Sequence, residues 1–415
     1  RFTCSKTDNG VVESLVDCIQ LKRENLNKER HYNDRVDSLG MQLDSRWSFA
    51  SGRIRLLAGA ETYLDSVDSK LNTGTSSNLF DMQEQQRGNF SSDSWFLSTG
   101  FFINTVTNLF QLGENGRIRA SAGLRFSSFS AHAPKVPGIG DVDYSFSGLV
   151  SSASLQWIHG KLSNLYFSFN QGFRAPNLQE STVLGDTGSK FEIPNDQLKP
   201  ESANSYELGL RIHAAFLQLH TALFYTQLKD TISESPASYN AQDAIDGKPV
   251  VQRINAGSGT IQGVESALII PWGNFALDLG ASLTLGDIKD PDGTTTPMRR
   301  SPPLTATAGL RYSFPSQKGS LRFYAQAAAA AERLHPSDLK DLRICETAPY
   351  SGVLSAPCSG TQSWATLNLT ASWQLNASIK SRIAILNITD ETYRWHGSGF
   401  DRPGFNSRIM LEGSF

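Results

Sequence analysis

Hydrophobic and polar residues alternate through most of this chain, in short segments separated by turns or loops. From Arg117 to Phe126 one face of a strand would carry only apolar side chains: Ile118, Ala120, Ala122, Leu124 and Phe126. The opposite face would carry the arginines Arg117, Arg119 and Arg125. Arginines are costly in the dry core of a β-sandwich and cost little in a water-filled barrel. The pattern therefore favours strands with lipid on one side and a wet lumen on the other.

About fifteen strands of this kind are predicted, at residues 36–47, 53–63, 95–106, 117–129, 145–158, 163–173, 201–213, 216–229, 250–270, 274–288, 303–314, 319–332, 364–374, 378–388 and 405–415. We keep 319–332 as a strand despite the helix propensity of 325–332, because Leu321 and Phe323 alternate with polar neighbours. Compact turns alternate with long polar loops such as 132–143, as in outer-membrane barrels, where the turns are periplasmic and the loops extracellular. The fold class is therefore all-β, a transmembrane antiparallel β-barrel.

Tryptophan positions support a membrane barrel, since interfacial aromatic residues form a belt at each edge of the apolar band. Six tryptophans at or near predicted strand ends are assigned to these belts: Trp47, Trp95, Trp157, Trp272, Trp364 and Trp373. The odd spacing of Trp364 and Trp373 places the two on opposite faces of one strand unless a bulge intervenes.

Composition and hydropathy argue against a nucleic-acid-binding protein and against a protein with transmembrane helices. Lys plus Arg is 38, Asp plus Glu is 40 and the net charge is −2, so no basic footprint for nucleic acid exists. No apolar run reaches the roughly 18 residues that a transmembrane helix needs. The hydrophobic content of 39% suits strands that are apolar on one face only.

The cysteines form two local pairs, Cys4 with Cys18 and Cys345 with Cys358. No histidine or further cysteine stands at zinc-site spacing beside them, so no metal site is expected. Two small disulfide-closed loops in an oxidising compartment are expected, with four unrelated thiols as the alternative. Residues 1–35 are expected to form an extracellular loop that contains the first pair, and residues 36–415 the barrel.

Four stretches and the last residue resemble the C-terminal barrel of TonB-dependent outer-membrane receptors. They are GFRAPNLQE at 172–180, NDQLKPESANSYELG at 195–209, INAGSGTIQGVE at 254–265, NITDETYRWHGSGFDRPG at 387–404, and Phe415. The resemblance implies a bacterial outer-membrane barrel of about 22 strands with a plugged lumen, and Phe415 as a signal for barrel assembly. It also implies that the plug, the energy-coupling segment and about seven strands are supplied by another segment or another chain.

The same resemblance implies a function. The protein would import a scarce nutrient, an iron chelate (siderophore) or haem, with the TonB protein acting through the absent N-terminal region. Six residues of the outer loops are candidates for ligand binding: Arg174, Tyr393, Arg394, Trp395, His396 and Arg402. For Arg174 the alternative is a structural ion pair with Glu180 or Glu201, and for Trp395 it is the aromatic belt. The similar haem receptors carry a ligating histidine between the first two motifs, and no histidine stands between Arg174 and Asn195 here.

No cofactor and no catalysis are expected, since the chain has no GxSxG, no HExxH and no phosphate-binding glycine loop. Two alternatives remain open. A non-energised barrel, porin-like or adhesive, would differ in having no plug domain upstream. A secreted carbohydrate-binding β-protein or hydrolase is disfavoured by the tryptophan belts and the inward arginines.

Overall fold

The computed structural model describes residues 28–75, 83–84, 90–136, 139–187, 190–255, 257–289, 293–315, 318–341, 344 and 360–414. Residues 1–27 of the expected N-terminal loop lie outside the described residues, as do all four cysteines and Phe415: Cys4, Cys18, Cys345, Cys358 and Phe415. Within the described ranges, no helix has the length and apolar character needed to cross a membrane.

One antiparallel sheet of seventeen strands forms the wall of the molecule. Fifteen of them follow one another as a meander: β1 (Lys28–Phe49), β2 (Ile54–Thr75), β4 (Ser94–Leu112), β5 (Gly116–Val136), β6 (Gly140–His159), β7 (Ser163–Arg174), β10 (Glu201–Ala214), β11 (Leu217–Lys229), β15 (Ser258–Trp272), β16 (Phe275–Lys289), β18 (Thr305–Ser313), β19 (Gly319–Ala328), β20 (Trp364–Gln374), β21 (Ile379–Leu386) and β22 (Asn406–Gly413). The short strands β3 (Gln83–Glu84) and β17 (Thr295–Pro297) pair with β2 and β16. The predicted all-β meander is confirmed.

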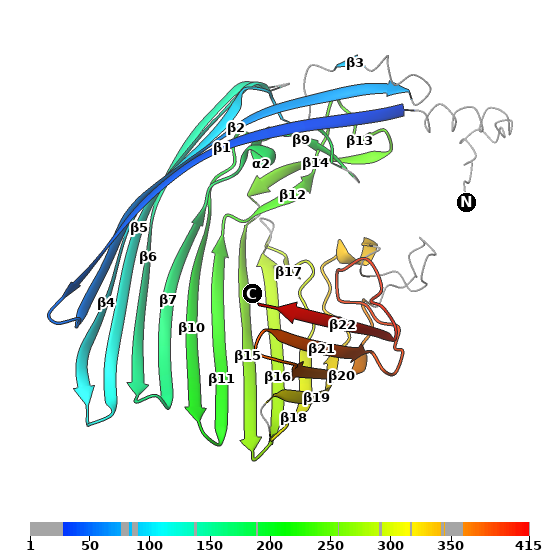
Figure 1. Ribbon diagram of the computed structural model, residues 1–415. Helices are drawn as coiled ribbons and strands as arrows, with labels where there is room; N and C mark the ends of the chain where they lie inside the picture. The colour runs from blue at the N-terminus through cyan, green and yellow to red at the C-terminus, as the bar shows by residue number, and fades with distance from the viewer. Residues whose placement is uncertain are drawn as a thin grey trace.

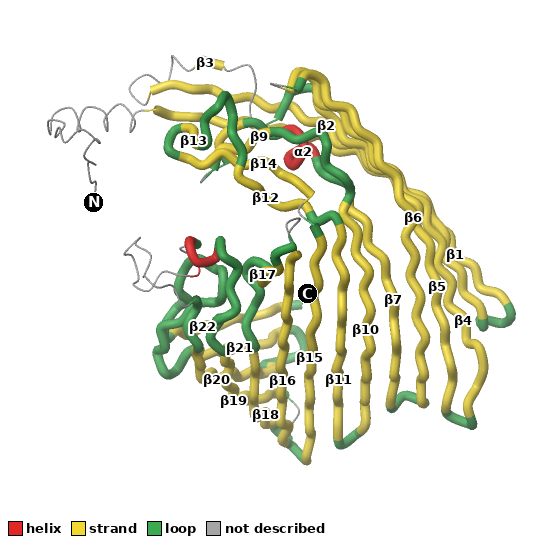
Figure 2. The backbone as a smooth tube through the Cα atoms, turned by 180° about the vertical axis from the view of Figure 1, so that it is seen from behind, coloured by secondary structure: helices red, strands yellow, loops and turns green. Residues whose placement is uncertain are grey.

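The sheet curls into a barrel that is open along one side, with β1 and β22 as its two edges (Figures 1 and 2). Compact turns gather at one end of the strands, which we call the turn end. The opposite end, the loop end, carries the long connections with α2 (Leu178–Thr182), η1 (Asp338–Lys340) and a second sheet of β8 (Gly185–Asp186), β9 (Phe191–Ile193), β12 (Ile232–Pro236), β13 (Ala244–Ile245) and β14 (Lys248–Asn255).

Strand limits at the loop end differ from the prediction. β1 begins at Lys28 rather than at residue 36, and β2 continues to Thr75 rather than ending at residue 63. The loop expected at 132–143 is mostly strand, because β5 runs to Val136 and β6 starts at Gly140. The strand expected at 250–270 is two strands, β14 and β15, and β19 ends at Ala328. Beyond the membrane both faces of a strand can be polar, so pairing continues where alternation stops.

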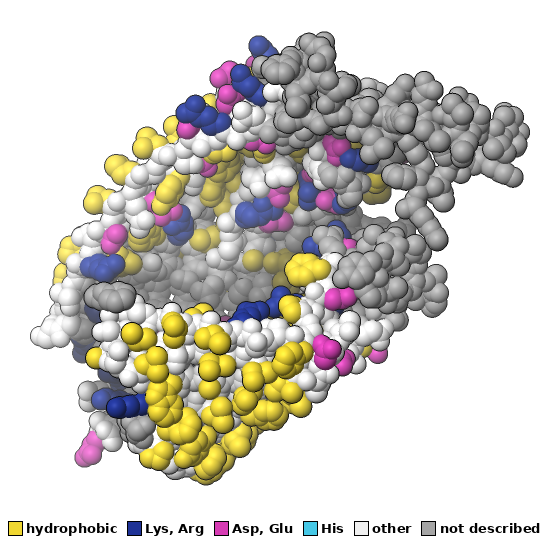
Figure 3. All heavy atoms as spheres, turned by 45° about the vertical axis from the view of Figure 1, so that its right-hand side comes forward, with side chains coloured by type: hydrophobic (Ala, Val, Ile, Leu, Met, Phe, Trp, Pro, Cys, Tyr) yellow, Lys and Arg dark blue, Asp and Glu magenta, His cyan; other side chains and the backbone are white. Residues whose placement is uncertain are grey.

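The two faces of the wall differ as predicted. On β5, Leu124 and Phe126 are 49% and 42% exposed on the outer face, whereas Arg125 bonds Glu61 of β2 on the lumen face. On β7, Phe167 is exposed outward and the Tyr166 hydroxyl donates to a Glu207 carboxylate oxygen at 2.6 Å. Figure 3 shows apolar side chains covering the outer surface near the viewer and charged side chains inside the hollow.

Four of the predicted belt tryptophans, Trp47, Trp157, Trp272 and Trp373, are exposed on the outer face. Trp364 is a correction, because its side chain is only 6% exposed and lies on the lumen face. β20 pairs with β19 without a bulge, so the odd spacing from Trp373 turns Trp364 inward. Trp95 is half-buried and stacks on His132, with ring centroids 6.1 Å apart.

Two glycines of the lumen face lie opposite aromatic residues on neighbouring strands. A Cβ at Gly209 would lie 2.1 Å from Cζ of Tyr166, and one at Gly59 would lie 2.5 Å from Cζ of Phe102. Each pair is in direct register across the strands. The aromatic ring therefore covers bare backbone, and a larger residue at either glycine would displace it.

A cluster of buried apolar side chains lies at the loop end rather than at mid-height of the wall. Its members come from β2, β5, β6 and α2: Val67, Ala131, Ala133, Val136, Val142 and Leu178, with Phe90, Phe96 and Tyr144 packed against them. The Tyr144 hydroxyl also donates to the carbonyl of Pro176 at 3.0 Å. The cluster fixes the connection after β7 against the wall.

Candidate functional site

Arg174, the last residue of β7, joins three segments of the loop end. Its guanidinium donates to both carboxylate oxygens of Glu180 at 2.7 and 3.0 Å, and its Nε donates to Glu201 of β10 at 2.5 Å. Glu201 also accepts from the backbone N–H of Ile232 at 2.6 Å. Glu180 in turn forms a reciprocal cap with Asn177 at the start of α2. The ion pair considered for Arg174 is therefore present, to both carboxylates.

We call the second sheet, β8–β9–β14–β12 with β13, the outer sheet. It combines the connection after β7 with the connection after β11, since β9 pairs in parallel with β14. Arg253 crosses it, with its Nε 2.5 Å from Glu192 and its terminal nitrogen 3.1 Å from Glu234. Glu234 also contacts Lys190. The Glu192 side chain is only 2% exposed, so its pairing with Arg253 is needed to offset desolvation.

Two asparagines from the resembling motifs fasten the same connections to each other. The Asn195 side-chain amide donates to the carbonyl of Arg253 at 2.7 Å. Asn255 accepts from the backbone N–H of Lys199 at 2.8 Å and donates back to its carbonyl at 2.9 Å. The structure thus brings together three of the four sequence motifs. The asparagines of these motifs form hydrogen bonds with the backbone of neighbouring loops.

The fourth motif forms the connection between β21 and β22. The Asn387 side chain donates to the carbonyls of Glu391 at 2.8 Å and Pro403 at 3.3 Å. Arg394 is bound within the loop, with its Nε 2.8 Å from Asp401. Arg402 of this loop is exposed. These bonds fix the loop so that its aromatic residues face the lumen.

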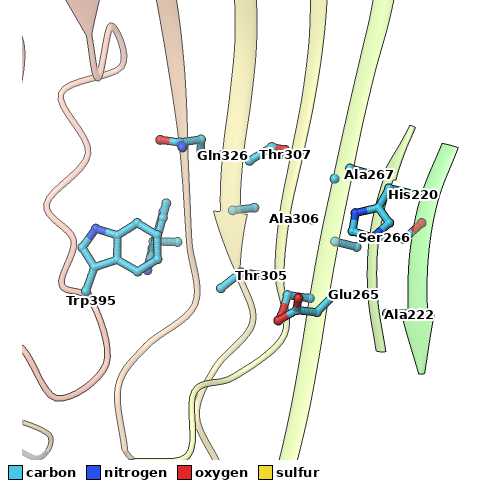
Figure 4. A pocket seen from close by; sticks show the side chains of 15 residues that line it. His220, Ala222, Glu265, Ser266, Ala267, Thr305, Ala306, Thr307, Gln326 and Trp395 are labelled. Atoms are coloured by element: carbon cyan, nitrogen blue, oxygen red, sulfur yellow. The ribbon is translucent and has the colours of Figure 1, made fainter. Parts of the chain in front are cut away.

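An aromatic group from this loop and from β20 borders a cavity of about 400 Å³ on the lumen wall. The rings of Trp364 and Tyr393 have centroids 4.4 Å apart, and those of Trp364 and Trp395 lie 5.1 Å apart at 72°. We call the space the aromatic cavity. Its lining includes His220, Glu265, Thr305, Thr307, Gln326, Trp364 and Trp395, together with small residues of β11, β15, β16, β18 and β19. Figure 4 shows Trp395 facing these strands from across the cavity.

His396, next to Trp395, is held inside the loop. Its Nδ1 lies 3.0 Å from the Thr361 hydroxyl, and its Nε2 is buried without a hydrogen-bond partner. Burial lowers the pKa of His396, and the nearby Arg300 adds to this effect while Asp338 and Asp341 oppose it. The imidazole is therefore kept neutral near neutral pH. Among the described residues, no group of three or more His, Cys, Asp or Glu side chains could hold a metal ion.

The structure divides the six predicted ligand residues. Arg174 and Arg394 are engaged by carboxylates, Tyr393 packs on Trp364, and His396 turns into its loop, whereas Trp395 and Arg402 are exposed. A ligand role for any of them stays a prediction. Sequence reasoning did not single out the wall residues of the aromatic cavity, such as Gln326 and Glu265. Their lumen-facing positions in alternating strands were the available signal.

Residues 4–388 match the family model described as TonB dependent receptor-like, beta-barrel. The chain belongs to the TonB-dependent receptor family. It is therefore a bacterial outer-membrane barrel protein, with the loop end outside the cell and the turn end in the periplasm. Members of this family are receptors and transporters.

Among curated relatives, the Hemoglobin-haptoglobin utilization protein B of Neisseria meningitidis serogroup C is 26% identical over 320 residues, covering 69% of this chain and 38% of that protein. The Hemin receptor of Yersinia enterocolitica is 30% identical over 131 residues, covering 27% of this chain and 18% of that receptor. The chain thus spans less than two fifths of the length of either relative.

Solved structures share the fold. The Copper transporter OprC superposes with a TM-score of 0.69 at 17% identity, covering 93% of this chain and 57% of that one. A double mutant of the Serratia marcescens hemophore receptor HasR, in complex with its hemophore HasA and heme, gives 0.65 at 16% identity, with coverage of 93% and 60%. At these sequence identities the structural similarity shows only that the fold is shared.

Proposed function

We propose that this chain is the wall and the outer loops of an energy-coupled receptor that imports an iron chelate or haem. The observation that carries the proposal is the family match over residues 4–388. Relatives named for haemoglobin and hemin favour an iron-bearing ligand. Import would proceed without catalysis, and the TonB protein would supply force through a segment outside these 415 residues.

Ligand contact is proposed for the aromatic cavity and its rim. Trp395 offers an exposed indole face to a planar ligand, and Trp364 and Tyr393 support it from behind. Arg402 is available for an anionic group of the ligand, such as a carboxylate or catecholate. Arg174 and Arg394 would act indirectly, by holding the loops that frame the mouth.

The way in which iron would be held follows from the histidines. No histidine stands between Arg174 and Asn195, and the Nε2 atom of His396 is buried. We therefore propose that the β21–β22 loop binds the ligand by ring stacking and charge and supplies no histidine ligand to the iron. His220 of β11, which lines the aromatic cavity, lies outside that loop. This proposal holds for a siderophore and for haem alike.

Growth on defined iron sources tests the proposal. A strain lacking the gene should fail to grow on one of haemin, haemoglobin or a ferric siderophore as sole iron source, and the intact gene should restore growth only when TonB is present. A Trp395→Ala receptor should restore growth poorly while reaching the outer membrane in normal amount. Uptake that continues without TonB and extends to unrelated solutes would favour a porin-like barrel instead.

A further inference from the structure

The lumen face of the wall carries charged residues at two heights on the same three strands, β2, β4 and β5. At the upper height, Arg125 of β5 reaches over Gly100 of β4 to the carboxylate of Glu61 on β2. A Cβ at Gly100 would lie 2.6 Å from a guanidinium nitrogen of Arg125, so the glycine leaves room for the Arg125 side chain to cross β4. Charge at this height is balanced within the wall.

Near the turn end the same strands carry positive charge without such balance. Arg55 lies at the start of β2, and Arg117 and Arg119 lie at the start of β5. They share the lumen face with Glu61 and Arg125, because they are separated from them by even numbers of residues. The charges of Arg55 and Arg117 both repel that of Arg119. We call these three residues the lower arginines.

No carboxylate of the described chain pairs with the lower arginines. Arg119 finds only the amide oxygen of Asn108, at 3.3 Å. Asn108 lies beside an irregularity in the pairing of β4 with β5, and Arg53 from the preceding turn already donates to its carbonyl at 2.9 Å. The oxygens within reach are therefore neutral, and Asn108 serves two arginines, Arg119 through its side-chain oxygen and Arg53 through its backbone carbonyl.

We propose that the lower arginines dock an acidic segment of the polypeptide that fills the lumen. This inference rests on the proposed function and on the plugged lumen that the resemblance to TonB-dependent receptors implies. A protein segment that covers the arginines would remove their water, and desolvated cations without anionic partners are strongly unfavourable. The occupant must then bring carboxylates of its own.

The width of the surface that carries the lower arginines, and the residues on the opposite face of the wall, further define the partner. Arg55, Val106 and Ser121 are opposite one another across β2, β4 and β5, so the surface is about 10 Å wide and suits at least two carboxylates. Membrane lipid would meet the other face of the wall, where Leu124 and Phe126 are exposed. Chain of sufficient length exists in the family, since this chain covers 38% of the haemoglobin-haptoglobin relative.

Photocrosslinking in the receptor expressed from its own gene tests this docking. A benzophenone amino acid replaces Val106, which lies on the lumen face between Arg55 and Ser121, and in a control receptor it replaces Ile103, which is 43% exposed on the outer face. Irradiated cells should give an intramolecular crosslink from position 106 to a peptide rich in Asp and Glu. Position 103 should crosslink to lipid only.

Charge variants then separate docking from simple proximity. The double variant Arg117→Glu with Arg119→Glu should lower the crosslink yield several-fold, and Arg119→Lys should leave it nearly unchanged. Both receptors should keep the heat-modifiable gel mobility of a folded barrel. A crosslink to a peptide without acidic residues, to the imported ligand or to lipopolysaccharide would overturn the inference, and so would no crosslink at 106 while 103 reacts. Iron-dependent growth, measured in parallel, shows separately whether the receptor function stands.

Discussion

The two sides of the loop end, which we call the outer mouth, differ in whether their charged and aromatic side chains are paired or exposed. On the side of β7 to β15, Arg174, Arg253 and Glu192 are paired with charges of their own chain, and a buried apolar cluster fixes α2 to the wall. On the side of β20 to β22, Trp395 and Arg402 remain exposed beside an open cavity. The motif residues of the first side thus hold the loops in place, and we propose that contact with a ligand is made by the second side.

The largest effect on the difference between the two sides is expected from removing Arg253, the arginine that crosses the outer sheet. Arg253→Ala should destabilise the outer sheet by about 3–5 kcal/mol, because it leaves the buried Glu192 carboxylate without a partner. Hydrogen exchange of residues 185–255 would then speed up, while exchange in the β21–β22 loop would not change. A matched variant, Arg402→Ala, should leave exchange on both sides unaltered. Equal loosening of both sides would show that the mouth is one cooperative unit.

Truncation of the exposed indole tests the second side. Trp395→Ala should weaken ligand binding about tenfold, equivalent to about 1.4 kcal/mol, since a stacked aromatic contact is worth roughly that much. Thermal stability should change little, because Trp395 is 38% exposed. Titration of purified receptor with haemin or a ferric siderophore, followed by tryptophan fluorescence, measures the loss. An unchanged affinity would indicate that the ligand binds on the first side, from β7 to β15, instead.

A smaller effect is expected from the helix cap on the first side. Asn177→Ala removes the side-chain acceptor for the Glu180 N–H and should cost about 1 kcal/mol. The cost should be local, because Arg174 still holds Glu180 and the apolar cluster still holds Leu178. Limited proteolysis between 175 and 187 reports it, with Asn177→Asp as the variant that retains a capping oxygen. Loss of the whole outer sheet in Asn177→Ala would contradict this independence.

The sequence predicted the strands better than it predicted the mouth, for a physical reason. Inside the membrane every strand must alternate between lipid and lumen, so each of the meander strands leaves a period of two in the sequence. At 28–35 and 65–75 the strands rise above the membrane, where the outer face meets water and the pattern is lost although pairing continues. On the lumen side Val67 is buried in the apolar cluster. The predicted ends were wrong at those places because alternation was the only signal used.

Side-chain roles at the mouth were harder to predict, because they depend on partners far apart in sequence. Arg174 could be assigned a carboxylate since Glu180 and Glu201 are near in sequence, but the pairing of Arg253 with Glu192 joins two separate loops. Trp364 was assigned to the aromatic belt from its place at a strand end. The odd spacing from Trp373 indicated opposite faces for the two residues, and the bulge-free pairing with β19 turns Trp364 inward. Its ring contacts with Tyr393 and Trp395 come from another loop and could not be predicted from the strand.

The smallest expected effect is a dependence of the second side on pH. Burial lowers the pKa of His396 below the value of about 6.5 that the residue has in an open loop. Above about pH 6.5 both forms are neutral and the loop is unaffected. As the pH falls below this value the open loop takes up the proton first, so acid favours opening of the β21–β22 loop. Opening at residues 387–405, measured by exchange relative to the intrinsic amide rate at each pH, should therefore rise between about pH 7.5 and about pH 5.5, and His396→Gln should abolish the rise. The outer sheet on the first side, whose carboxylates are already paired with Arg253 and Lys190, should show no such change over the same interval. A rise on both sides would mean that the two sides open together rather than independently.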